Sequence, residues 1–89
     1  MCGIFGLFIN DNKKYNQNDI KKSLNKIACL SEERGKDSSG FAFFKENTVN
    51  IIKGDIPISS LIRTNKFDQI FSDFVNSNCF SVIGHSRLV

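Results

Sequence analysis

Two stretches of the chain repeat apolar residues at the spacing of one helix face. In residues 18–34 the repeat consists of Ile20, Leu24, Ile27 and Ala28. In residues 66–75 it consists of Phe67, Ile70, Phe71, Phe74 and Val75. Side chains three or four positions apart share one side of a helix, so this pattern predicts two helices that each bury one face. Asn16 or Asn18 can cap the start of the first helix, and Gly35 is placed to end it in a left-handed conformation.

Four shorter apolar runs, bounded by turn-forming residues, predict strands. The run over residues 3–9 is bulky throughout, which is typical of a buried strand. Runs over 41–45 and 49–53 flank Glu46-Asn47, which predicts a hairpin, and a fourth run covers 79–83. The predicted order is β-α-β-β-α-β, so we expect an α+β fold in which striped helices cover a sheet.

Composition narrows the class of protein. The chain has 89 residues, enough for one small domain, and it is 40% hydrophobic with nine Phe, which favours a packed core over disorder. Its net charge of +3 is spread along the sequence without a basic block, so we expect no nucleic-acid partner. The first apolar run is too short to span a bilayer and lacks a basic segment before it, so we expect no membrane association.

The three cysteines, Cys2, Cys29 and Cys79, do not form the even, regular spacing of a disulfide framework. The single histidine and the absence of paired cysteines predict no metal site and no cofactor. A reducing compartment, the cytoplasm, is the simplest location for such a chain. We interpret Cys29 as incidental, on the side of its helix away from Ile20, and Cys79 as a small buried residue.

Cys2 is the first candidate for chemistry. Cysteine at position two is small enough for Met1 to be removed, which leaves a thiol and a free α-amine on one residue. The amine has a reference pKa of about 7.7 to 8, so part of it is neutral near pH 7 and can accept the thiol proton. Nucleophile and general base are then one residue. The alternative is a small apolar residue that lies near the terminus without a chemical role.

Two further stretches combine glycine with polar or charged residues. Residues 34–40 read Arg-Gly-Lys-Asp-Ser-Ser-Gly, and 84–87 read Gly-His-Ser-Arg. Arg87 offers a planar fork that matches a carboxylate, so it suits recognition of an amino-acid carboxylate. The simpler interpretations are a helix end followed by a turn for the first stretch, and a solvated arginine beside a structural His85 for the second.

Taken together, Met1-Cys2-Gly3-Ile4-Phe5-Gly6, Arg34-Gly35-Lys36-Asp37-Ser38-Ser39-Gly40 and Gly84-His85-Ser86-Arg87 resemble the three opening motifs of the class II glutamine amidotransferases. The middle motif is most similar to the branch containing glutamine:fructose-6-phosphate aminotransferase, and amidophosphoribosyltransferase is similar at all three. The resemblance implies an N-terminal-nucleophile (Ntn) hydrolase with a four-layer αββα sandwich. Residues 1–89 would be the N-terminal, truncated part of such a domain.

The resemblance also implies a reaction. The Cys2 thiol attacks the side-chain amide of glutamine, ammonia leaves, and water hydrolyses the thioester to give glutamate. Arg87 matches the position that binds the glutamine α-carboxylate. The resemblance gives a supporting role in the site to Arg34, Gly35, Asp37, Ser38, Gly40 and His85.

The sequence departs from the family at three points. Leu88 follows the motif arginine, where the family often has Trp or Tyr. The family's Asn-Gly oxyanion hole and the aspartate that holds the substrate amine lie further along than residue 89. Loss of one oxyanion donor lowers a rate by about a hundredfold to a thousandfold, so we expect no measurable glutaminase activity from this chain alone. We also expect open sheet edges and exposed apolar faces, because the second sheet would be incomplete.

Several functions stay open at this point. The ammonia would pass to a synthase domain or subunit beyond residue 89: a sugar-phosphate isomerase would make an aminosugar synthase, and a phosphoribosyltransferase a purine enzyme. A stand-alone hydrolase of another amide is a third option. The alternative is an inactive relative that acts as an interaction or regulatory module, which retention of Met1 would favour. An oligomer is compatible with each of these functions.

Overall fold

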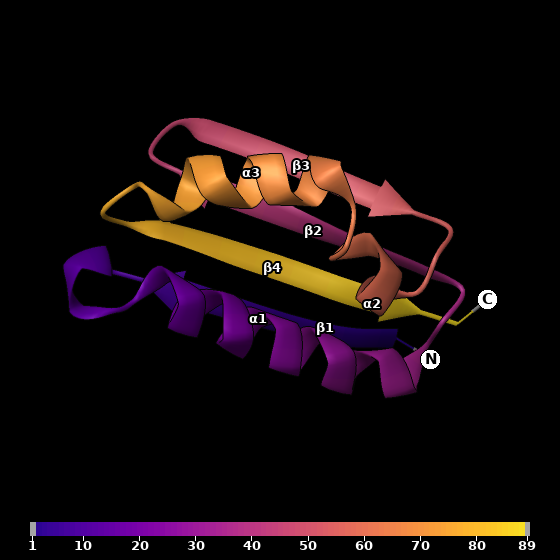
Figure 1. The fold of residues 1–89 in the computed structure, drawn as a ribbon. Coiled ribbons are helices and arrows are strands. Elements are labelled where there is room, and N and C mark those ends of the chain that lie inside the picture. The colour runs from indigo at the N-terminus through magenta and orange to yellow at the C-terminus, as the bar shows by residue number, and fades with distance from the viewer. Residues whose placement is uncertain (1, 89) are drawn as a thin grey trace.

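Four strands form one antiparallel sheet in the computed structural model, which describes residues 2–88 (for Asn12, the backbone alone) (Figure 1). The strands are β1 (Cys2–Ile9), β2 (Ser38–Lys45), β3 (Thr48–Gly54) and β4 (Phe80–Arg87). Their order across the sheet is β1-β4-β2-β3, so the last strand lies between the first and the second. The motif stretches at the start, middle and end of the sequence thereby become neighbours.

Helices form a second layer on one face of this sheet (Figure 1). They are α1 (Gln17–Ser31), α2 (Ile58–Leu61) and α3 (Asn65–Val75), with short 3-10 turns η1 (Asn12–Lys14) and η2 (Glu32–Arg34). In Figure 1, α1 runs along β1, and α3 lies over β2 and β3. The described residues are therefore a mixed α+β domain of two layers, with the predicted order of the main elements.

The helix boundaries follow from capping residues. The Asn16 side chain accepts a hydrogen bond from the backbone N–H of Asn18 at 2.7 Å, which confirms one of the two predicted caps of α1. Thr64 caps α3 in the same way by accepting from the backbone N–H of Phe67 at 3.2 Å. The prediction that Gly35 ends the helix in a left-handed conformation was wrong. Its φ of 177° is extended, and the 3-10 turn η2 lies between the end of α1 and Gly35.

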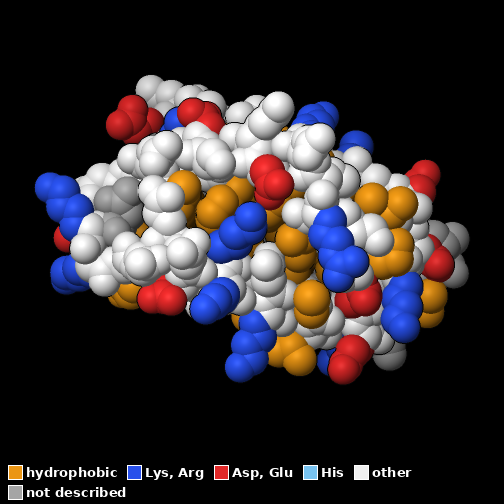
Figure 2. Space-filling view, in the orientation of Figure 1, with side chains coloured by type: hydrophobic (Ala, Val, Ile, Leu, Met, Phe, Trp, Pro, Cys, Tyr) orange, Lys and Arg blue, Asp and Glu red, His pale blue; other side chains and the backbone are white. Residues whose placement is uncertain are grey.

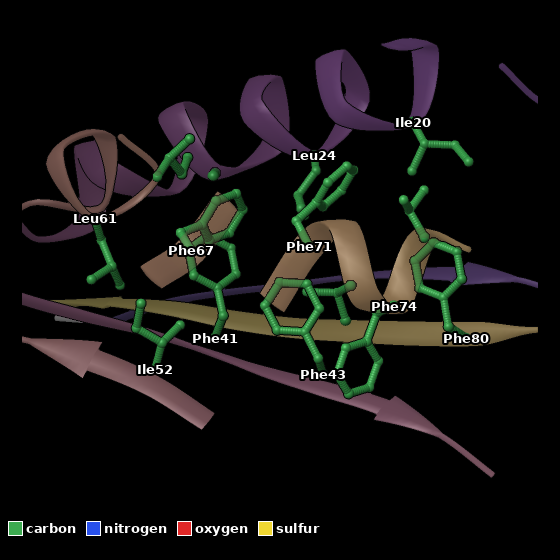
Figure 3. Close-up of a cluster of buried hydrophobic side chains, with 14 of the residues drawn as sticks. Ile20, Leu24, Phe41, Phe43, Ile52, Leu61, Phe67, Phe71, Phe74 and Phe80 are labelled. Carbon is green, nitrogen blue, oxygen red and sulfur yellow. The ribbon is translucent and has the colours of Figure 1, made fainter. Parts of the chain in front are cut away.

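The core lies between the helices and the sheet (Figure 3). Phe67 and Phe74 of α3 are fully buried against Phe41 and Phe43 of β2, with ring centroids 5.0 Å apart for Phe41 and Phe67 and 5.5 Å apart for Phe43 and Phe74. The α1 side contributes Leu24, Ala28 and Ile20, all buried. The helical spacing in the sequence thus selected the correct buried faces of both helices.

The strands differ from the sequence prediction in burial and in length. β1 was expected to be buried, but it is an edge strand on which buried and exposed residues alternate, and Ile4 and Phe8 are 78% and 69% exposed. Cys79 was expected to be buried and is exposed, one position before β4 begins. β4 extends to Arg87, so residues 84–87 lie within the strand, because it pairs with a strand on each side.

The face of the sheet opposite the helices carries large exposed apolar side chains. We call it the open face; its exposed apolar residues are Ile4 and Phe8 of β1, Val49 and Ile51 of β3, and Ile83 of β4. Alternation along each strand explains the division, since every second side chain points away from the helices. The sequence prediction of an exposed apolar face agrees with this arrangement. On the helical side, shown in Figure 2, basic and acidic side chains are interspersed.

Candidate functional site

The strand register brings the three motif stretches to one end of the sheet. Cys2 of β1 pairs with Arg87 of β4, and Arg87 pairs on its other side with Ser38 of β2. Neighbouring strands lie about 4.8 Å apart, so these three residues form a continuous row. All three belong to the open face, since the buried neighbours Gly3, Ser39 and Ser86 point toward the helices.

The loop after η2 lies directly on the end of β4. A Cβ atom at Gly35 would come within 2.3 Å of the Arg87 carbonyl carbon and 2.4 Å of the Leu88 nitrogen. Only glycine allows this approach, because a side chain would overlap the β4 backbone. The Asp37 backbone N–H donates a hydrogen bond to the Arg87 carbonyl at 2.9 Å. The glycine of the second motif is thus explained by contact with the third motif, not by a left-handed turn.

Gly40 makes room for His85 in the next row of the sheet. These two residues are register partners, and a Cβ atom at Gly40 would lie 2.9 Å from His85 Nε2. Lys53 of β3 is the partner of Gly40 on the other side, and its Cβ is 3.2 Å from the same point. The histidine and the lysine therefore approach each other across a strand that has no side chain there.

A buried hydroxyl pair joins the end of α1 to β4. The Ser31 Oγ donates to the Ala28 carbonyl at 2.7 Å and lies 2.9 Å from the Ser86 Oγ. Because the single Ser31 hydroxyl hydrogen is directed to Ala28, Ser86 donates to Ser31. Ser86 is fully buried, so this contact fixes the helix end against the strand that carries Arg87. Sequence reasoning missed Ser31, although a serine on the buried side of a striped helix was the available signal.

Glu32 connects the same region to α2. Its Oε1 accepts hydrogen bonds from the Ser59 hydroxyl at 2.6 Å and from the Ser59 backbone N–H at 3.1 Å. The Ser59 hydroxyl, followed by the Ser59 backbone N–H, stabilises the carboxylate and lowers the pKa of Glu32 below its ordinary value of 4.5. The segment that leads into the second motif is therefore attached at two points, one by Ser31 and one by Glu32.

Two separate hollows lie at this end of the sheet, with no lining residue in common. A cavity of about 510 Å³ is lined by Ser38, Ser39, Lys53, Gly54, Asp55, His85 and Arg87. A second hollow of about 400 Å³ lies at the β1 edge and is lined by Cys2, Gly3, Ile4, Phe5, Ile27, Leu30, Ser31 and Arg34. Cys2 and Arg87 are register neighbours that line different hollows. Arg34 lines the same hollow as Cys2. Gly35 and Asp37 contact the backbone at the end of β4, and Gly40 lies against the His85 side chain, which lines the first cavity.

The first cavity contains positive charge that is not paired within the described residues. The ion pairs formed within residues 2–88 are Lys21–Asp68 and Lys45–Asp73, neither of which involves a cavity residue. Lys53 and Asp55 are cavity residues that sequence reasoning missed, because a hairpin strand and the turn after it carry no motif. Among the residues that the structure describes, no three His, Cys, Asp or Glu side chains gather as a metal site.

Compared with known protein families, curated proteins and solved structures, the chain gives no significant match. Within residues 2–88, no helix has both the length and the apolar character needed to cross a bilayer.

Proposed function

We propose that residues 1–89 are the N-terminal part of a class II glutamine amidotransferase domain that hydrolyses glutamine to glutamate and ammonia. The observation that supports this most is the row of Cys2, Arg87 and Ser38, which come from three motifs far apart in the sequence. A nucleophile and a carboxylate-binding guanidinium on adjacent strands match the two ends of a glutamine molecule. The acceptor of the ammonia is a domain or subunit beyond residue 89.

Met1 is removed first, because an amine within a peptide bond cannot accept a proton. The free amine of Cys2 then takes the thiol proton, and the sulfur attacks the amide carbon of glutamine. The same proton is delivered to the departing nitrogen, so ammonia leaves and a γ-glutamyl thioester remains. Water adds to the thioester, the bond between carbon and sulfur breaks, and glutamate leaves as the Cys2 thiol re-forms. Arg87 holds the α-carboxylate through these steps.

The finer part of the fold proposal is an αββα sandwich. Its support is the open face, where Ile4, Phe8 and Ile51 are largely exposed on the same side of the sheet as Cys2 and Arg87. A second sheet over this face would bury these side chains, since two sheets pack about 10 Å apart through such residues. The site row would then lie at the end of the space between the two sheets.

Covalent labelling tests the proposed nucleophile. The diazoketone analogue of L-glutamine, once protonated, loses dinitrogen to an attacking thiolate and forms a thioether. Cys29 and Cys79 are also exposed and serve as internal controls in the same molecule. We expect one adduct, on Cys2, in protein that has lost Met1, with protection by L-glutamine and weaker protection in Arg87→Ala. Equal labelling of all three cysteines would contradict the proposal.

A second candidate function is an interaction module without catalysis. Its support is that Cys2 lines the hollow of Arg34 while Arg87 lines the other cavity. The intact mass of protein from its natural source separates the two candidates. Retained Met1 favours the module, because the Cys2 amine is then blocked, and loss of Met1 favours the enzyme.

A further inference from the structure

A second row of residues lies directly behind the site row, on the helical face of the sheet. It consists of Gly3, Ser86 and Ser39, which are register partners across β1, β4 and β2. All three are buried, and each is next in sequence to one residue of the site row. Elsewhere on this face the buried side chains are apolar, as at Phe41 and Val82. The two hydroxyls therefore form a polar layer that is confined to the end of the sheet with the candidate site.

The end of α1 rests on this second row at two points. The first is the hydrogen bond of 2.9 Å between the Ser86 and Ser31 hydroxyls. The second is Gly3, where a Cβ atom would come within 2.8 Å of the Ser31 carbonyl oxygen and 3.1 Å of the Arg34 Cβ and Cγ atoms. Because Gly3 has no side chain, the stem of Arg34 lies close against β1, and Arg34 lines the same hollow as Cys2. The two contacts therefore set where Arg34 lies relative to Cys2.

The hydroxyl pair fixes a position more than it adds stability. Replacing both hydroxyls by apolar groups of the same shape can be nearly neutral for the free energy of unfolding. A hydrogen bond, however, has a preferred length and direction, which an apolar contact lacks. Within residues 2–88 the Arg34 guanidinium makes neither a hydrogen bond nor an ion pair of its own. Its place beside Cys2 therefore depends on the backbone that carries it, which Ser86 holds through Ser31.

We propose that Ser86 is a positioning residue for the attack by Cys2, an inference that rests on the proposed function. Through Ser31 it holds Arg34 in the hollow of Cys2. There the positive guanidinium attracts the thiolate that forms when the amine takes the thiol proton. Ser86 does not touch the reacting sulfur, because its side chain lies on the opposite face of the sheet from Cys2. Its effect on the reaction passes through Arg34.

Alkylation by iodoacetamide tests this assignment without the need for a glutamine site. The Cys2 thiolate displaces iodide and forms a thioether, and the exposed Cys79 in the same molecule gives the reference rate. In the chain with a free Cys2 amine, we expect Ser86→Ala to lower the ratio of the Cys2 rate to the Cys79 rate by about fivefold. The matched control is Ser39→Ala, which removes a buried hydroxyl of the same row that donates to the Ile56 carbonyl at 2.8 Å instead of to α1. This control should leave the ratio unchanged.

The combination with an Arg34 variant separates positioning from a general loss of stability. Arg34→Gln should lower the ratio by the same factor as Ser86→Ala, and the double variant should lower it no further, because both changes act through one guanidinium. If Ser86→Ala does not fold, as judged by circular dichroism, Ser31→Ala removes the acceptor of the same hydrogen bond and takes its place. An unchanged ratio in Ser86→Ala, an equal loss in Ser39→Ala, or losses that multiply in the double variant would each overturn the assignment.

The outcomes separate this inference from the proposed function. If the diazoketone labels Cys2 with protection by L-glutamine while Ser86→Ala leaves the alkylation ratio unchanged, the glutaminase proposal stands and the Ser86 assignment is wrong. If the ratio depends on Ser86 through Arg34 while the diazoketone labels Cys2 no faster than Cys79, Ser86 positions the groups around the nucleophile and the glutaminase proposal fails.

Discussion

The two faces of this sheet are built from the same strands but differ in what covers them. On the helical face, Phe41 and Phe43 are buried under α3. On the open face, Ile4 and Phe8 remain mostly exposed, and Cys2 and Arg87 lie at one end. The stability of the described residues therefore comes from one face, while the candidate chemistry lies on the other. Substitutions on the two faces should have different consequences, and four predictions test this, beginning with the largest effect.

Phe67→Ala should have the largest effect on stability. Phe67 is fully buried and its ring lies within 6.0 Å of the rings of Phe41, Phe43 and Phe71, measured between centroids. Truncation of a buried phenylalanine costs about 3–5 kcal/mol of unfolding free energy. Denaturation by urea, followed by circular dichroism, measures it. A loss below about 1 kcal/mol would mean that the helical face does not carry the core.

Gly35→Ala should have the second largest effect. The new Cβ would overlap the backbone at Arg87 and Leu88, so the loop or the end of β4 must move. Overpacking of this kind costs about 1–3 kcal/mol, and it should also weaken binding of L-glutamine by displacing Arg87. The control is Gly6→Ala, whose Cβ would meet the Phe8 ring at 3.3 Å, a side chain that is free to shift. Equal losses in both variants would argue against the close approach.

Glu32→Gln should have a smaller effect that depends on pH. The pKa of Glu32 is lowered in the folded chain by the Ser59 hydroxyl and the Ser59 backbone N–H. Its stabilising contribution is therefore present above the ordinary value of 4.5 and is lost as the pH falls through the lower folded value. We expect the curve of unfolding free energy against pH to be flatter for Glu32→Gln than for the unmodified chain over this acid range. Glu33→Gln, an exposed neighbour, should leave the curve unchanged, and a change of equal size in both variants would refute the contact's role.

Phe8→Ser should change stability least of all. Its side chain is 69% exposed on the open face, so the expected change in unfolding free energy lies within about 0.5 kcal/mol. The same substitution should reduce self-association at high protein concentration, because an exposed apolar patch promotes it. Sedimentation velocity of the unmodified chain and the variant measures this effect. A large loss of stability would mean that the open face contributes to the core.

The sequence prediction succeeded for the helices and failed for features that depend on neighbouring strands, namely the burial of β1 and the conformation of Gly35. Helical spacing identified the buried sides of α1 and α3, because the residues that share a helix face are close in sequence. The burial of β1 was predicted wrongly, since a bulky run is compatible with a buried strand and with an edge strand. The prediction of a left-handed Gly35 was also wrong. Glycine is suited both to a positive φ and to a close approach of two backbones, and only the position of β4 shows that the close approach is the reason here.

The sequence by itself determined the helix faces, the order of the main elements and the residue types available for chemistry. These depend on local spacing and on side-chain identity. Only the tertiary structure decided that β4 lies between β1 and β2, that Cys2 pairs with Arg87, and that Arg87 pairs with Ser38 on its other side. Strand order and register are set by contacts between segments far apart in the chain, and these contacts cannot be predicted from local propensity.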